Sequence, residues 1–174
     1  MNLKNKAKIT VGTLGTILVA SFHTGLAAQG RLNIGGGSAN YGVHNLQGGF
    51  TPDPAQISVT SGPSAKNSVN IADLNLGAGC TGHATQEPDI IVNYTDSASF
   101  LRFYVQGSGD TALIVNDPNG NWRCDDDTAG LNPQLDFRSP ASGQYDIWVS
   151  SYEAGANINA TLHVTELPSN QAHN

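Results

Sequence analysis

A strict alternation of apolar and polar residues recurs along most of this chain and constrains its fold more than any other feature. In the segment 157–165, Ile158, Ala160, Leu162 and Val164 alternate with polar side chains. Side chains two residues apart lie on the same face of a β-strand, so this period predicts a strand with one buried face. Similar runs predict about eight strands in all, within residues 57–60, 69–76, 90–94, 101–106, 111–115, 135–137, 145–150 and 157–165.

Short turns rich in Gly, Pro, Asn and Asp separate the expected strands, and no segment has the 3.6-residue apolar period of a surface helix. We therefore expect an all-β fold, an antiparallel β-sandwich of jelly-roll type, in residues 50–167. Before it, we expect residues 29–49 to form a flexible lead-in rich in Gly and Asn, with one short strand near 32–34. After it, we expect residues 168–174 to form a polar, frayed tail.

The first residues have the features of a targeting segment. Lys4, Lys6 and Lys8 precede an apolar stretch at 9–19, and small residues follow at 25–28. This order predicts a secretory signal peptide over 1–28, cleaved after Ala27 or Ala28. The apolar stretch is shorter than the ~20 residues that span a bilayer. We therefore expect a secreted or periplasmic protein with no transmembrane segment in its mature chain.

The balance of charges narrows the classes of partner. The chain has 8 Lys and Arg residues and 14 Asp and Glu residues, and removal of the signal peptide leaves five against 14, a net charge of −9. An acidic surface disfavours nucleic acids and anionic membranes and favours cations, including divalent metals. We expect the partner to be an extracellular or periplasmic protein or polysaccharide, whose identity the sequence does not give.

Two cysteines, Cys80 and Cys124, are present in the whole chain. Export places them in an oxidising compartment, where a disulfide between them is expected. The bond would close a loop of roughly 45 residues, which the chain-entropy model values at about 4 kcal/mol. The alternative is a pair of free or metal-bound thiols.

The stretch 117–127, read D-P-N-G-N-W-R-C-D-D-D, concentrates oxygen-bearing side chains. Hard oxygen ligands at this density indicate a candidate Ca²⁺ site, and the 1-3-5 spacing at its start is common in Ca²⁺ loops. The EF-hand pattern fails, because Trp122 occupies the place of the required Gly and no Glu follows at the twelfth position. The alternative is a solvated acidic loop held by local Asx turns. The candidate ligands are Asp110, Asp117, Asn119, Asn121, Asp125, Asp126 and Asp127.

The two tryptophans offer a second kind of candidate site. In the alternation over residues 145–149, Trp148 falls on the strand face opposite to that of Tyr145, Ile147 and Val149. An exposed Trp148 would provide a platform for sugar rings or a protein partner. The alternative is that long loops also cover the second face of its sheet. Trp122, close to Cys124, is expected to pack on the disulfide.

Motifs of hydrolytic enzymes are absent from the chain, including G-x-S-x-G, G-D-S-G and H-E-x-x-H. The mature histidines are His44, His83, His163 and His173. Of these, His83 is expected in a turn and His163 on the polar side of the last strand. We therefore expect no enzymatic activity.

Four segments together resemble the bacterial pre-peptidase C-terminal (PPC) domain: G-D-T-A-L-I-V at 109–115, D-P-N-G at 117–120, P-A-S-G-Q-Y-D-I-W-V at 140–149 and T-L-H-V-T at 161–165. The resemblance covers roughly residues 89–166. It implies a β-sandwich that binds, targets or stabilises and does not catalyse, and related collagen-binding domains bind Ca²⁺ and matrix polymers. This chain departs from the family's usual setting because no peptidase domain accompanies the module.

The sequence therefore predicts an exported, non-catalytic binding, targeting or structural module with a β-sandwich fold and a candidate Ca²⁺ site. Two alternatives stay open. One is a Ca²⁺-assisted carbohydrate-binding module, and the other is an accessory partner of a secreted protease.

Overall fold

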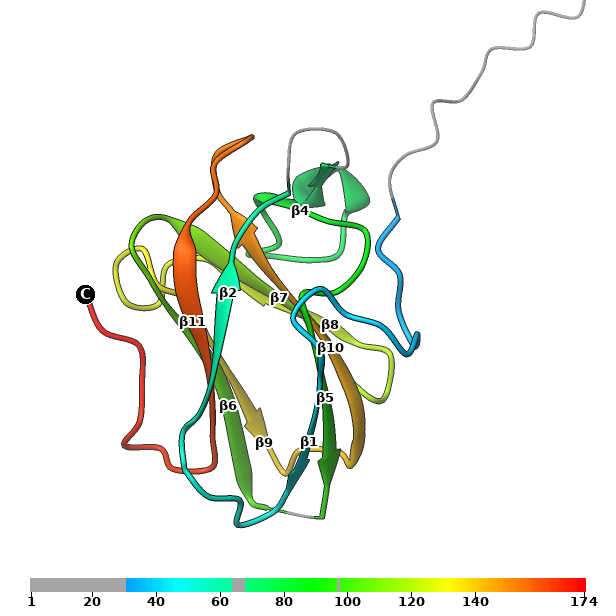
Figure 1. Cartoon of the computed structure of the whole chain (residues 1–174), viewed down its shortest axis with the longest axis vertical. Coiled ribbons are helices and arrows are strands. Elements are labelled where there is room, and N and C mark those ends of the chain that lie inside the picture. The colour runs from blue at the N-terminus through cyan, green and yellow to red at the C-terminus, as the bar shows by residue number, and fades with distance from the viewer. Residues whose placement is uncertain (1–30, 64–67, 97) are drawn as a thin grey trace, which may run out of the picture.

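Two β-sheets packed face to face make up most of the protein (Figure 1). The structure, a computed structural model, describes residues 31–63, 68–96 and 98–174. The expected all-β sandwich is confirmed, with more strands than predicted and one short 3₁₀ helix, η1 (Ile71–Leu74). The strands are β1 (Val43–Gln47), β2 (Ala55–Thr60), β3 (Val69–Asn70), β4 (His83–Ala84), β5 (Ile90–Thr95), β6 (Phe100–Gly107), β7 (Thr111–Asn116), β8 (Trp122–Asp125), β9 (Gln134–Arg138), β10 (Gly143–Ser151) and β11 (Asn159–Thr165).

The two sheets differ in size and in strand direction. The four-stranded sheet has the order β2-β11-β6-β9 and is antiparallel throughout. The seven-stranded sheet has the order β1-β5-β10-β4-β3, and β7 pairs with both β10 and β8. In this sheet β1 pairs with β5 in parallel, which departs from the antiparallel expectation. A parallel pair requires a long connection, and the chain between β1 and β5 passes through β2, β3 and β4.

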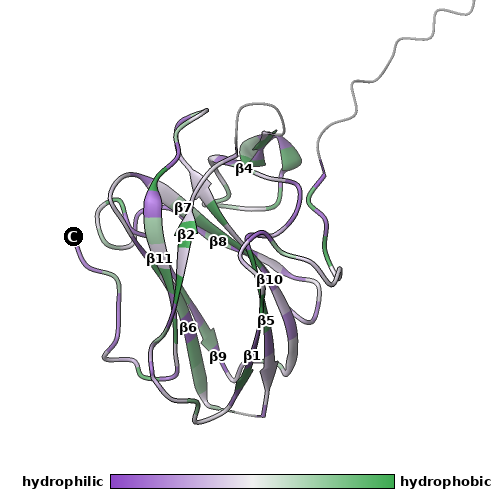
Figure 2. Cartoon of the chain, viewed as in Figure 1, coloured by the Kyte–Doolittle hydropathy of each residue, from purple (hydrophilic) through white to green (hydrophobic). Residues whose placement is uncertain are grey.

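The main core lies between the sheets and is built from the apolar side chains whose alternation the sequence predicts. Phe103 of β6, Tyr145 of β10 and Leu162 of β11 are each fully buried there. Figure 2 shows that hydrophobic residues follow the strands, whereas hydrophilic residues gather in the loops and the C-terminal tail. Burying one such large side chain contributes about 1.5–3 kcal/mol. The period-2 pattern therefore provides the main driving force for the sandwich.

A second apolar cluster covers the outer face of the seven-stranded sheet. The segment from β3 to β4 folds over this face and is attached to β8 by the disulfide Cys80–Cys124, as predicted. Gly82 passes so close to β10 that an added Cβ would lie 2.8 Å from the carbonyl oxygen of Ser151. The strand expected over 69–76 is instead β3 followed by η1, because the Asn70 side chain accepts a hydrogen bond from the N–H of Ala72 and caps the helical turn.

Trp148 lies in this second cluster and is 0 % exposed. Its proposed role as a ligand platform is therefore wrong, and the alternative that the second face is covered is confirmed. Trp122 packs beside it, with ring centroids 5.6 Å apart. Cys124 joins the same cluster, which agrees with the expectation that Trp122 packs near the disulfide.

Both ends of the described chain are more ordered than predicted. The lead-in expected over 29–49 contains β1, and the short strand expected near 32–34 is absent from the described residues. The strand β1 was not predicted, because it forms by pairing with β5, which is distant along the chain. The tail 168–174, red in Figure 1, packs against the sandwich, since Ala172 is buried and Arg102 of β6 donates to the carbonyl oxygens of Pro168 and Asn170.

The predicted signal peptide over 1–28 lies outside the described residues. Within the described ranges, no helix has the length and apolar character needed to cross a membrane.

Candidate functional site

The β7–β8 hairpin places the predicted metal ligands at two opposite ends. The turn 117–121 joins the two strands at one end, and the register of the pair brings Asp110 beside Asp126 and Asp127 at the open end. The candidate ligands of the turn and those at the open end therefore do not share one site. A hairpin separates the residues of its turn from the residues that flank its strands.

At the turn end, Asp117 holds the loop by itself. Its Oδ1 accepts hydrogen bonds from the backbone N–H groups of Asn119 and Asn121, each at 2.9 Å. The side-chain amide of Asn121 donates to both carboxylate oxygens of Asp117, at 3.2 and 3.1 Å. These contacts form an Asx turn, which was the alternative to a metal loop at this position. Asp117, Asn119 and Asn121 are therefore turn residues and lie apart from the carboxylates at the open end of the hairpin.

Asp125 also has a structural role. Its Oδ2 accepts hydrogen bonds from the backbone N–H of Thr128 at 3.2 Å and from that of Gln134 at 2.8 Å. The carboxylate is thus committed to the loop that follows β8 and to the start of β9. Asp125 does not belong to the group of carboxylates that could share a metal ion.

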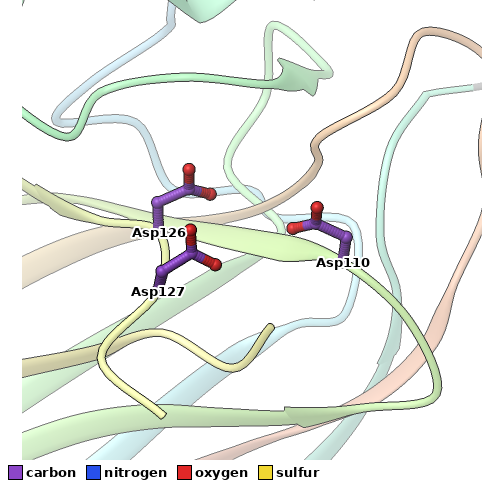
Figure 3. Close-up of side chains that lie close together, drawn as sticks. All are labelled: Asp110, Asp126 and Asp127. Atoms are coloured by element: carbon purple, nitrogen blue, oxygen red, sulfur yellow. The ribbon is translucent and has the colours of Figure 1, made fainter. Parts of the chain in front are cut away.

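Asp110, Asp126 and Asp127 form an acidic cluster at the open end of the hairpin (Figure 3). Each offers a carboxylate oxygen, and these oxygens all lie within 4.8 Å of one another. Figure 3 shows Asp110, which directly precedes β7, facing Asp126 and Asp127 across the space between them. Two oxygens bound on opposite sides of a Ca²⁺ ion, at its usual distance of about 2.4 Å, would lie about 4.8 Å apart. Oxygens no farther apart than this are close enough to bind one shared cation.

Two oxygens of the acidic cluster are buried without a protein partner. Oδ1 of Asp110 and Oδ1 of Asp126 have no hydrogen bond to any described residue. Across the described ranges the only salt bridge joins Arg102 to Asp136, so no arginine there neutralises the cluster. A buried, unsatisfied carboxylate oxygen is costly, and a cation would remove that cost.

The pKa values of the acidic cluster respond to this environment. Desolvation, followed by the nearby charges of Asp127, Asp110 and Asp125, raises the pKa of Asp126 to about 6. Desolvation, followed by the charges of Asp127 and Glu153, also raises the pKa of Asp110. Crowded carboxylates that resist ionisation are the expected environment of a site whose counter-charge is a bound cation.

A serine and a histidine meet at the edge of the second apolar cluster. The Ser68 hydroxyl lies 3.2 Å from Nδ1 of His83. A nucleophilic triad needs a third group that orients the base. Within the described residues, no carboxylate hydrogen-bonds to His83, so this pair lacks the third group.

Asp110, Asp126 and Asp127 were among the predicted ligands, but residue type alone does not separate them from the residues of the turn. The signal that separates them is the register of the hairpin. Counting equal numbers of residues outward from the turn 117–121 brings Asp110 opposite Thr128, directly after Asp126 and Asp127.

Comparisons with known proteins identify no family for this chain. No family model matches it, and no curated protein matches it. Among solved structures, it is similar to PliG of Aeromonas hydrophila, a periplasmic inhibitor of g-type lysozyme, with a TM-score of 0.38 and 14 % identity. The match covers 71 % of this chain and 96 % of that chain. At this level the likeness carries no conclusion about the partner of this protein.

Proposed function

We propose that this protein is an exported, non-catalytic binding module whose β-sandwich is stabilised by Ca²⁺ held by Asp110, Asp126 and Asp127. The observation that carries the proposal is the convergence of these three carboxylates, with two of their oxygens buried and unpartnered. The disulfide Cys80–Cys124 supports an oxidising compartment outside the cytoplasm. The resemblance of roughly residues 89–166 to the PPC domain supports the same class of function.

Ca²⁺ fits the chemistry of the acidic cluster better than Mg²⁺ does. Ca²⁺ accepts six to eight oxygen ligands in irregular geometry, whereas Mg²⁺ requires a near-ideal octahedron and gives up its waters reluctantly. The acidic cluster offers carboxylates from two separate segments, and Asp127 is exposed, which leaves room for water ligands. The bound ion would be a structural group and would supply no chemistry beyond joining these segments.

The position of the acidic cluster in the fold gives the ion a structural purpose. The Asx turn of Asp117 closes one end of the β7–β8 hairpin. An ion between Asp110 and the pair Asp126 and Asp127 would close the other end. Because β8 is an edge strand held by β7, such a clamp would stabilise the part of the seven-stranded sheet with the fewest pairing partners.

Thermal unfolding in EDTA and in Ca²⁺ tests the proposal directly. At a free concentration 100-fold above Kd, binding to the folded state alone adds about 2.7 kcal/mol, which for a domain of this size raises Tm by about 5–10 °C. Mg²⁺ should raise Tm less. Asp126→Asn should abolish the Ca²⁺ shift and should raise Tm in EDTA, because it removes one of the crowded charges.

Asp73→Asn is the matched control, since Asp73 is an exposed acidic residue on η1, outside the cluster. This variant should keep the full Ca²⁺ shift. Equal Tm values of the parent protein in EDTA and in millimolar Ca²⁺ would overturn the metal site. Hydrolysis of casein, simple esters or common polysaccharides by the parent protein, lost in Asp126→Asn, would overturn the proposal that the protein is not catalytic.

A further inference from the structure

A hollow of about 460 Å³ lies on the outer face of the four-stranded sheet, at its β2 edge. The alternation of β2 and β11 creates it. Ile57 and Leu162 point into the core, so the residues next to each of them along its strand point outward. Its lining includes Tyr41, Ser58, Thr60, Gln106, Asn159 and Thr161.

Tyr41 borders this hollow with its hydroxyl group already engaged. The hydroxyl accepts a hydrogen bond from the backbone N–H of Thr60 and donates one to the carbonyl oxygen of Thr60, each at 3.0 Å. These two bonds fix the side chain against the edge of β2. Tyr41 nevertheless stays 37 % exposed. The part of Tyr41 that remains for a ligand is therefore its positioned aromatic ring.

The other side chains of the hollow offer neutral hydrogen-bonding groups. The hydroxyls of Ser58 and Thr161 make no hydrogen bond within the described parts of the chain, and these two residues lie opposite each other in the β2–β11 pair. The Nδ2 group of Asn159 is also available, since only its Oδ1 is engaged, by Thr60. The amide of Gln106 is committed to the backbone of His173. Two hydroxyls and one amide donor thus remain for a ligand.

Among the residues that the structure describes, none that lines the hollow is charged. A phosphate, a nucleotide or an acidic peptide would find no cation there, and a purely apolar ligand would desolvate hydroxyl and amide groups without compensation. A neutral sugar matches both features, because its C–H face stacks on an aromatic ring and its hydroxyls pair with hydroxyl and amide groups. The volume also falls within the range of about 300–1,000 Å³ that is usual for ligand sites.

We propose that this hollow binds a neutral carbohydrate, with a sugar ring stacked on Tyr41 and its hydroxyls bonded to Ser58, Asn159 and Thr161. This inference rests on the proposed function as a binding module and names its ligand class. It uses no residue of the acidic cluster, so sugar binding does not require Ca²⁺.

An extended peptide added to the edge of β2 is the competing occupant. The outward backbone groups of Thr60 are already satisfied by Tyr41, which blocks one end of that edge. The side chains next to the edge are polar and provide no apolar sockets of the kind that give strand addition its specificity. These observations favour the sugar.

Titration calorimetry with soluble neutral oligosaccharides of glucose, xylose, mannose and N-acetylglucosamine tests the proposal, in EDTA and in Ca²⁺. At least one should bind saturably in both buffers. Tyr41→Ala should weaken that binding about tenfold or more, equivalent to 1.4 kcal/mol. Tyr41→Phe keeps the ring but loses the two hydrogen bonds to Thr60 that position it, so it should weaken binding less than Tyr41→Ala does. Tyr152→Ala, which removes another exposed tyrosine outside the hollow, should have no effect.

The double variant Ser58→Ala with Thr161→Val removes the two hydroxyls while keeping the backbone pairing, so it tests the site even if Tyr41→Ala does not fold. Binding to it should also fall about tenfold. Failure of every oligosaccharide to bind, or binding that these variants leave unchanged, would overturn the proposal. Binding of an extended peptide that Ser58→Pro abolishes would favour the competing occupant and overturn it as well.

The two proposals fail in different ways. Sugar binding without a Ca²⁺-dependent shift in Tm would remove the metal site and leave the sugar site. A Ca²⁺-dependent shift in Tm without sugar binding would remove the sugar site and leave the metal site.

Discussion

Asp125 of β8 accepts a 2.8 Å hydrogen bond from the backbone N–H of Gln134 at the start of β9. Because β8 and β9 are edge strands of different sheets, this contact joins the two sheets along one side of the sandwich. Two residues earlier, Arg123 donates to the carbonyl oxygen of Asp136 at 2.6 Å. Unpaired backbone N–H and C=O groups on a sheet edge promote aggregation. Here two charged side chains of β8 form hydrogen bonds with backbone groups of the β9 edge.

Removing the Asp125 carboxylate should weaken this connection. Asp125→Ala leaves the N–H groups of Thr128 and Gln134 without their acceptor, which should lower the free energy of unfolding by about 2 kcal/mol and Tm by about 4–8 °C. Thermal unfolding in EDTA measures the change without any contribution from a bound ion. Asp73→Ala, an exposed control, should stay within about 0.5 kcal/mol of the parent, and an equal loss in both variants would contradict the prediction.

The alternation of apolar residues was sufficient to predict the strands that border the main core. Leu101, Phe103 and Val105 of β6 all face it. The same pattern failed for 71–76, where a capped helical turn separates the apolar residues. It also missed β1, whose place depends on pairing with β5. Local sequence encodes which face a strand buries, but it does not encode which distant strand pairs with it.

Prediction of the sites was limited by the same missing information. Residue types alone grouped Asp117 with Asp126, and only the register of the hairpin separates them. The burial of Trp148 follows from a disulfide that holds the segment between β3 and β4 over its sheet. The hollow beside Tyr41 has no motif in the sequence, because its residues come from separate strands.

The disulfide should be necessary for the second apolar cluster. Changing Cys80 and Cys124 together to Ser should lower the free energy of unfolding by about 2–4 kcal/mol. Since both tryptophans of the chain lie in this cluster, their fluorescence emission should shift to longer wavelength as the covering segment loosens. In the unreduced parent, a thiol reagent should label neither cysteine, and stoichiometric labelling would disprove the bond.

The C-terminal tail should contribute to stability. Deletion of residues 168–174 removes two carbonyl acceptors of the buried Arg102 guanidinium and the paired contacts between Gln106 and His173. The free energy of unfolding should fall by about 1–3 kcal/mol. Hydrogen exchange should show protection of the His173 amide in the full chain. Ser169→Ala alters an exposed tail residue and should change nothing, whereas an unprotected tail whose deletion is harmless would mean that it is frayed.

Because of Asp89, the free energy of unfolding should be larger near pH 4 than above pH 6. Its carboxylate is buried between the side-chain amide of Asn40 at 3.0 Å and the backbone N–H of Val149 at 2.9 Å, and desolvation raises its pKa from the ordinary value of 3.8 to about 6.

The folded state therefore binds this proton more tightly than the unfolded chain does. Linkage then requires the free energy of unfolding to fall as pH rises from about 4 to about 6, by up to about 3 kcal/mol, and to stay low above that range. Urea unfolding of Asp126→Asn in EDTA isolates this contribution, because that background removes the other carboxyl with a pKa near 6. Adding Asp89→Asn should flatten the profile between pH 4 and 6, although it lowers stability overall by placing an amide donor against one of the two N–H donors. An unchanged slope in the double variant would show that Asp89 does not carry the pH dependence.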